Sequence, residues 1–257
     1  MIFYFSGSGG TRWAAKGLGL GDDLVDMGEA LRFGELEFDL TRETRVGFFL
    51  PTYFWGPPRA VVEFLEKARF DLPKSCYVYT VMTCGGSTGN ADRMLARLLE
   101  KKSLVPQAFF ALKLVDNYSV MFPVPPREKQ RRVEAEAEAA LETVRTAVAA
   151  CTRGDHNGCR GPLPGIITPL IYRAYGPEGP TTGLFSVSDA CVGCGLCAGL
   201  CPDGAIQMEG GKPVWKAQRC TRCLSCFHHC PAAAISAGRF SLKFGRYLHP
   251  AEGHTER

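Results

Sequence analysis

Eight cysteines in the last third of the chain have the type and the spacing of iron–sulfur ligands. They form two runs of one pattern, Cys-x-x-Cys-x-x-Cys-x-x-x-Cys-Pro, made first of Cys191, Cys194, Cys197, Cys201 and Pro202, and then of Cys220, Cys223, Cys226, Cys230 and Pro231. Both runs continue into the same Ala-Ile pair, at 205–206 and at 234–235. The stretch from 191 to 231 is therefore a duplicated unit.

The spacing predicts two [4Fe–4S] clusters with crossed ligands. Three closely spaced cysteines can surround one cubane cluster, whereas the fourth cysteine of the run, moved away by a short helix, ligates the other cluster. One cluster is then held by Cys191, Cys194, Cys197 and Cys230, and the other by Cys220, Cys223, Cys226 and Cys201. Zinc sites and disulfides are the alternatives, but neither needs a third cysteine in each run followed by x-x-x-Cys-Pro.

This segment, roughly residues 185–236, resembles the bacterial two-cluster ferredoxins. The chain has 257 residues, which leaves room for a second domain with its own core. No apolar run approaches the length of a membrane span, and the basic residues are too scattered for a nucleic-acid surface. Cysteines kept available for iron favour a reducing cytoplasm, and an anaerobic host is compatible with them.

A second chemical signal lies near the start of the chain. The apolar run 2–5 predicts a buried strand, and a turn rich in glycine and hydroxyls follows it, made of Ser6, Gly7, Ser8, Gly9, Gly10 and Thr11. Between a strand and a helix such a turn offers N–H and O–H donors to an anion. It is not a Walker loop, because no Gly-Lys-Ser/Thr follows, and it is not Gly-x-Gly-x-x-Gly, because Arg12 stands where the last glycine would be. The turn resembles the phosphate loop of flavodoxins, and a plain turn between strand and helix is the alternative.

Two further loops follow predicted strands. After the strand 46–50 come Thr52, Tyr53, Phe54, Trp55 and Gly56, and after the strand 76–82 come Thr83, Cys84, Gly85 and Gly86. By the flavodoxin resemblance, Tyr53 or Trp55 stacks on the flavin, unless these aromatics seal the core or a domain interface. The third loop departs from flavodoxins because it has no second aromatic, so one flavin face is open. Cys84 could contact the ring, but a role as a small structural residue is favoured.

The order of elements predicts an α/β fold, a flavodoxin-like doubly wound parallel sheet of five strands, followed by a small α+β domain with two [4Fe–4S] clusters. The strands are expected at 2–5, 23–26, 46–50, 76–82 and 108–114. The predicted domains are 1–151, which binds FMN, a Gly/Pro-rich linker at 152–182, the ferredoxin domain at 183–237 and a tail at 238–257. Near the start of the linker, Cys151, His156 and Cys159 resemble part of a metal site without a fourth ligand, so a structural role is favoured.

The chain as a whole resembles the flavodoxin-like/ferredoxin fusion proteins. The resemblance implies an electron carrier that passes low-potential electrons between two [4Fe–4S] clusters, an FMN and an external redox partner. The alternatives are a flavin oxidoreductase that reduces a small substrate, or a ferredoxin with a flavin-free docking domain. No catalytic residue is assigned, since Asn117 and Tyr118 are weak candidates. The partners are open, and so is the oligomeric state, a dimer included.

Overall fold

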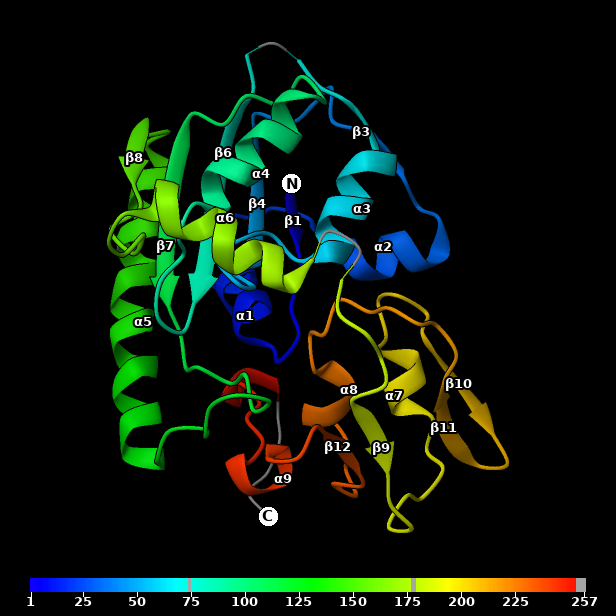
Figure 1. The fold of residues 1–257 in the computed structure, drawn as a ribbon. Helices are drawn as coiled ribbons and strands as arrows, with labels where there is room; N and C mark the ends of the chain where they lie inside the picture. Colours follow the sequence, from blue (N-terminus) through cyan, green and yellow to red (C-terminus); the bar gives the residue numbers. More distant parts are fainter. Residues whose placement is uncertain (74, 177–178, 253–257) are drawn as a thin grey trace.

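The computed structural model describes residues 1–73, 75–176 and 179–252, and its largest feature is a sheet of six strands (Figure 1). Each pair of neighbouring strands runs parallel. In spatial order the strands are β2 (Leu24–Asp26), β1 (Ile2–Tyr4), β4 (Arg45–Pro51), β6 (Tyr77–Cys84), β7 (Ala108–Lys113) and β8 (Gly154–His156). This α/β arrangement fits a flavodoxin-like domain.

The prediction of five strands is wrong by one, because β8 adds a sixth strand at the edge beyond β7. In this pair Ala108 lies opposite Gly154 and Phe110 opposite His156. β8 belongs to the segment 152–182 that was predicted as a linker, and α6 (Pro164–Tyr175) lies in the same segment. All of β8 is exposed and none of it is aliphatic, so no hydrophobic pattern indicates a strand there.

Helices cover both faces of the sheet, and each face has its own apolar core. One face packs against α1 (Gly10–Gly17) and α5 (Arg127–Ala149), and the other against α2 (Met27–Phe33), α3 (Arg59–Lys67) and α4 (Ala91–Glu100). Every residue of β6 is buried, as expected for a central parallel strand. A short parallel pair outside the main sheet, β3 (Glu37–Asp39) and β5 (Arg69–Asp71), extends one core by placing Phe38 and Phe70 edge-on to Phe3.

The cysteine runs fold into a small lobe, defined here as residues 184–237, which lies below α2 and α3 in Figure 1. Two antiparallel pairs frame it: β9 (Phe185–Val187) with β12 (Ile235–Ala237), and β10 (Ile206–Glu209) with β11 (Lys212–Trp215). Each cysteine run contains one helical turn, α7 (Leu196–Gly199) or α8 (Ser225–His228). We call this unit the cluster lobe.

The chain after the lobe returns to the first domain. It forms α9 (Ser241–Phe244) and a 3₁₀ turn, η1 (Pro250–Glu252). The His249 N–H donates to the carbonyl of Ser8 at 2.9 Å, and the His249 ring stacks on Trp13 with centroids 4.7 Å apart. The described part of the tail thus packs beside the first loop. None of the helices in the described part of the chain combines the length and the apolar character needed to cross a bilayer.

The first domain and the cluster lobe meet at the N-terminus of α3. Pro58 precedes this helix and has no side-chain acceptor, so the first N–H groups of α3 need partners from elsewhere. The Ala60 N–H donates to Thr221 Oγ1 at 3.0 Å, and the Arg59 N–H donates to the hydroxyl of Tyr175 at 3.1 Å. A threonine of the lobe therefore caps a helix of the other domain.

A buried carboxylate completes this junction. Asp203 accepts two hydrogen bonds from Thr221, from its N–H at 2.6 Å and its hydroxyl at 2.9 Å, and pairs with Arg59 at 2.6 Å. Its side chain is 4% exposed. Burial raises the pKa of Asp203, although Thr221 and Arg59 favour the charged form. The negative charge also lies near the positive end of the α3 dipole.

Replacing Asp203 should therefore destabilise the whole protein. Asp203→Ala leaves the Thr221 N–H without its acceptor and Arg59 with Glu63 alone, at a cost of about 3 kcal/mol in the free energy of unfolding. Anaerobic denaturant unfolding of the loaded protein measures this cost. Asp189→Ala is the matched control because it removes an ion pair with Lys212 at 2.6 Å that is fully exposed to solvent. Equal free energies of unfolding for Asp203→Ala and Asp189→Ala would show that the junction stabilises the protein no more than an exposed ion pair does.

Candidate functional site

A cavity of about 600 Å³ lies at the carboxyl end of the sheet, where the cluster lobe closes one side of it. Its volume is in the usual range for a cofactor site. The three loops predicted from the sequence line it together, because the carboxyl ends of parallel strands meet at one edge. The predicted residues that line it are Ser6, Gly7, Ser8, Gly10, Thr11, Thr52, Tyr53, Phe54, Trp55, Thr83, Cys84, Gly85 and Gly86.

Two glycines predicted with this set, Gly9 and Gly56, do not line the cavity. Gly9 has φ +90° at the start of α1, and a side chain there would collide with Glu252. A side chain at Gly56 would collide with the ring of Tyr172. Both glycines therefore allow another side chain to pack closely against their loops. A sequence motif does not distinguish this role from contact with a ligand.

The first loop holds its hydroxyls ready to donate. Ser6 Oγ accepts the Gly9 N–H at 3.1 Å, and Ser8 Oγ accepts from the side-chain amide of Asn117. Since each oxygen is already an acceptor, its own hydrogen is free to donate to a ligand. The first N–H groups of α1 begin in the same loop and have no acceptor within the helix. The loop can therefore bind an anion such as a phosphate.

The second loop turns tightly over the cavity. Tyr53 and Gly56 are joined by two backbone hydrogen bonds, of 2.9 and 3.0 Å, and the two residues between them, Phe54 and Trp55, have φ of +50° and +63°. Such a two-residue turn prefers Asn-Gly, because positive φ costs other residues about 1 kcal/mol each. Bulky aromatics kept in this conformation beside a cavity indicate a functional constraint.

The three aromatics of this loop have different neighbours. Phe54 stacks on Tyr175 with centroids 5.5 Å apart, and the Tyr53 hydroxyl lies next to Gly7 at the domain junction. Burial raises the pKa of Tyr53 well above its usual value, so it stays a neutral phenol. Tyr53 and Phe54 therefore pack at the junction, and all three aromatics line the cavity.

The cavity also contains residues that no loop motif predicted. Asp116, Asn117 and Tyr118 follow β7, and of these only the last two were noted as weak candidates. Ile171, Ala174 and Tyr175 come from α6, whereas Arg222, Cys223, Leu224, Tyr247 and His249 come from the cluster lobe and the tail. The residues after β7 follow a predicted strand, which is a usable signal. The others are brought in by tertiary packing alone.

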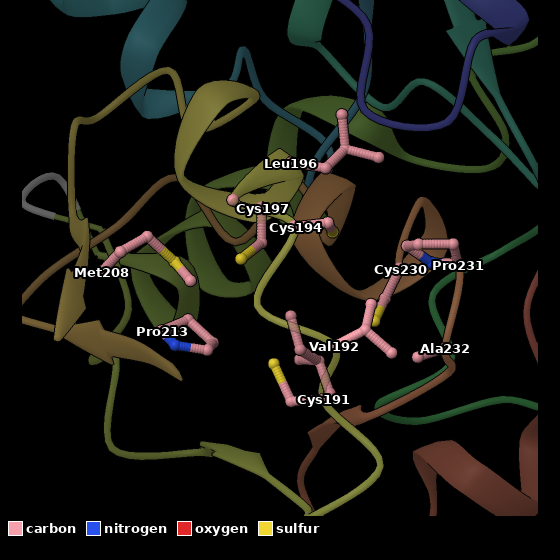
Figure 2. A pocket seen from close by; sticks show the side chains of 12 residues that line it. Cys191, Val192, Cys194, Leu196, Cys197, Met208, Pro213, Cys230, Pro231 and Ala232 are labelled. Atoms are coloured by element: carbon pink, nitrogen blue, oxygen red, sulfur yellow. The ribbon is translucent and has the colours of Figure 1, made fainter. Parts of the chain in front are cut away.

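Two small pockets in the cluster lobe gather the eight cysteines. Figure 2 shows the sulfur atoms of the first group around one space, lined by Cys191, Cys194, Cys197 and Cys230. The second pocket is lined by Cys201, Cys220, Cys223 and Cys226. Each pocket joins three cysteines of one run with the last cysteine of the other, which is the crossed arrangement expected for the clusters.

Backbone N–H groups point at these sulfur atoms. Ala205 donates to Cys201 and Ala234 to Cys230, each at 3.3 Å. These two bonds occupy equivalent places in the duplicated unit. The N–H of Arg222 donates to Cys220, also at 3.3 Å. Such bonds stabilise the negative charge of thiolate ligands and help to set the reduction potential of a cluster.

The cavity and the second cysteine pocket share a wall. Arg222, Cys223 and Leu224 line both of them. At this wall Gly7 lies directly against the carbonyl of Cys223. A ligand in the cavity would thus be separated from a metal group in the pocket by the residues of this shared wall alone.

The fragment formed by Cys151, His156 and Cys159 does not converge. Cys151 is exposed, and the His156 ring stacks on Phe110 with centroids 5.1 Å apart. Within residues 1–73, 75–176 and 179–252, no three Cys, His, Asp or Glu side chains are grouped to hold a single metal ion. The thiolates of a cubane cluster stand around a larger group, so this finding concerns single ions.

Comparison with known proteins identifies the cluster lobe. Residues 184–231 match the family described as a 4Fe-4S dicluster domain, which supports at least one [4Fe–4S] cluster and a role in iron–sulfur electron transfer. No curated protein sequence matches the chain.

Two solved structures are similar to part of the chain. The rubredoxin:oxygen oxidoreductase from the anaerobe Desulfovibrio gigas is 18% identical, with a TM-score of 0.34, over 58% of this chain and 36% of that one. The Trp repressor binding protein from Bacillus subtilis is 11% identical, with a TM-score of 0.34, over 55% of this chain and 97% of that one. The chain therefore spans about a third of the length of the first of these two proteins.

The wall between the cavity and the lobe gives a second prediction. In Gly7→Ala the added methyl overlaps the carbonyl oxygen of Cys223, so the lobe must shift and the thermal unfolding midpoint falls by several degrees, for a cost of about 2 kcal/mol. Gly86→Ala is the matched control, because nothing lies within 4 Å of the added atom. Differential scanning calorimetry compares the two, and an unchanged midpoint in Gly7→Ala would mean that the contact is not rigid.

Proposed function

We propose that this protein carries low-potential electrons between two [4Fe–4S] clusters, an FMN bound in the cavity and an external redox partner. The proposed FMN domain is residues 1–151, to which β8 adds an edge strand from the segment 152–182, and the proposed two-cluster domain is 183–237. Of the tail 238–257, the described part, 238–252, packs back against the first domain. The observation that carries the proposal is the shared wall, since Arg222, Cys223 and Leu224 line both the cavity and the second cysteine pocket.

The cavity fits FMN by its donors and its shape. Ser6, Ser8 and the start of α1 supply O–H and N–H donors for a phosphate, with no cation required. Trp55 would cover one face of the isoalloxazine, and the glycines at 85 and 86 would leave the other face accessible. The volume of about 600 Å³ also accommodates a mononucleotide.

The pockets fit two cubane clusters by their ligand sets. Each offers four cysteine sulfurs and receives backbone N–H bonds. Buried apolar residues such as Leu224, Phe227 and Ile235 surround the cysteines and limit the access of water. When bound, the clusters exchange single electrons and the flavin one or two, so together they can change electron number.

The first test is the cofactor content of anaerobically purified protein. We expect about eight iron, about eight acid-labile sulfide and about one FMN per chain. Four iron atoms per chain would mean that the lobe binds only one cluster. Iron without flavin, even after incubation with FMN, would leave the first domain as a docking domain. If the reduced protein consumed a small electrophile faster than it reduced a carrier protein, it would be an oxidoreductase and not an electron carrier.

The aromatic loop gives a separate prediction for the flavin. Trp55→Ala should weaken FMN binding about tenfold, because it removes a ring contact worth about 1.4 kcal/mol. Titration of flavin-free protein with FMN, followed by fluorescence quenching, measures the dissociation constant. Trp55→Phe should restore most of the affinity, and Phe33→Ala, which alters a residue 62% exposed, should leave it unchanged. If all three variants bound FMN with the same dissociation constant, Trp55 would not be part of the flavin site.

A further inference from the structure

Two cysteines outside the cluster pockets contact each other. Cys84 ends β6, Cys159 follows β8, and their thiols are hydrogen-bonded to one another. The Thr88 N–H donates to the Cys159 carbonyl at 2.8 Å, which fixes the backbone of Cys159 beside the loop that begins at Cys84. Residues far apart in the sequence thus form a close thiol pair.

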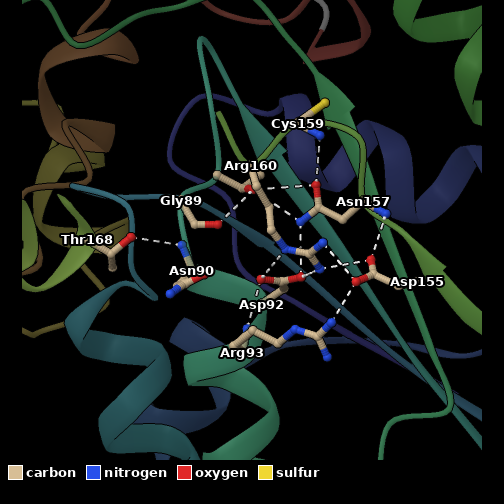
Figure 3. Close-up of polar contacts among 10 residues, drawn as sticks. Gly89, Asn90, Asp92, Arg93, Asp155, Asn157, Cys159, Arg160 and Thr168 are labelled. Atoms are coloured by element: carbon tan, nitrogen blue, oxygen red, sulfur yellow. Dashed lines mark hydrogen bonds and ion pairs between the residues drawn. The ribbon is translucent and has the colours of Figure 1, made fainter. Parts of the chain in front are cut away.

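A buried polar network holds Cys159 in this place (Figure 3). The Cys159 N–H donates to Asn157 Oδ1 at 3.0 Å, and the amide of Asn157 donates to Asp92 at 3.1 Å. Arg160 pairs with the fully buried Asp92 and with Asp155, the latter at 2.8 Å. The segment that carries Cys159 is therefore anchored to the start of α4, the helix that follows the Cys84 loop.

The two thiols differ in their access. Cys84 is 7% exposed and lines the cavity, whereas Cys159 is half-buried and does not line it. The pair thus connects the proposed flavin site with solvent. The sequence favours a role for Cys84 as a small structural residue, whereas its contact with Cys159 indicates a chemical role.

The two thiols also differ in acidity. The hydrogen bond from Cys84 lowers the pKa of Cys159 to about 6, against the effect of burial and with help from the charge of Lys113. The same bond, together with burial, raises the pKa of Cys84. A thiolate is the form that attacks disulfides, so the directions of these two shifts favour Cys159 as the attacking cysteine and Cys84 as the thiol that stabilises it.

We propose that Cys84 and Cys159 form a redox-active dithiol that reduces external disulfides of low molecular weight. The Cys159 thiolate attacks one sulfur of the substrate disulfide and releases one thiol. Cys84 then displaces the second thiol and forms the Cys84–Cys159 disulfide. That disulfide returns to the dithiol when its S–S bond breaks and it takes up two electrons and two protons from reduced FMN, which is left oxidised. This last step rests on the proposed function.

Glutathione provides the test of the pair. The loaded protein is equilibrated anaerobically in mixtures of oxidised and reduced glutathione, its free thiols are alkylated, and its peptides are mapped by mass spectrometry. We expect a reversible Cys84–Cys159 disulfide whose fraction rises with the oxidised form. In Cys84→Ser we expect glutathione trapped on Cys159, and in the matched control Cys151→Ser the internal disulfide unchanged. Thiols that stay reduced in oxidised glutathione alone would overturn the proposal.

Alkylation by iodoacetamide tests the division of roles. Because the pKa of Cys159 is lowered, its thiolate is present above pH 6, and its alkylation rate should be half-maximal near that pH. Cys84→Ser weakens the hydrogen bond and should move this midpoint upward by a unit or more. A midpoint that is the same in both proteins would contradict the pairing of the two thiols.

A reductive titration separates this inference from the proposed function. With bound FMN and a preformed internal disulfide, the protein should accept two more electrons from dithionite than Cys159→Ser of equal iron and flavin content. Equal electron uptake would overturn the exchange with FMN. Disulfide mapping needs no flavin, so a reversible disulfide in a protein that fails to bind FMN would support the dithiol while refuting the flavin half of the proposed function.

Discussion

The capping of α3 by Thr221 is the interaction on which the site depends. A helix that begins after Pro58 leaves its first N–H groups without acceptors, and the cluster lobe supplies one through a hydroxyl that Asp203 orients. The interaction fixes distance and direction, because a hydrogen bond to a helix end tolerates little displacement. The lobe is thereby held where Cys223 and Leu224 can form one side of the cavity.

The features predicted from sequence are those determined by local chemistry. Three closely spaced cysteines and a fourth before proline encode ligand geometry within a few residues, so the spacing alone assigns the cysteines from Cys191 to Cys230 to two groups. The three loops could be placed together since each ends a buried strand of a parallel sheet. Thirteen of their predicted residues line the cavity.

The features that were missed arise from contacts between distant segments. β8 is exposed and has no apolar alternation, so its pairing with β7 depends on where α5 returns the chain. Tyr175, Arg222 and His249 reach the cavity through the packing of α6, the lobe and the tail. The contact of Cys84 with Cys159 has the same origin. Neither residue has a neighbour in the sequence that indicates a dithiol. β7 pairs with both β6 and β8, and this brings the end of β6 and the chain after β8 to the same edge of the sheet.

The crossed cysteine pockets have a consequence for biogenesis. Each pocket combines three cysteines of one run with one of the other, so neither repeat contains a whole binding site. A ribosome delivers the chain from its N-terminus, and Cys230 emerges last of the eight. The first domain can fold while translation continues, but neither pocket has more than three of its four cysteines until Cys226 emerges. On the proposed function, both pockets are thus completed late in translation, after the first domain has emerged.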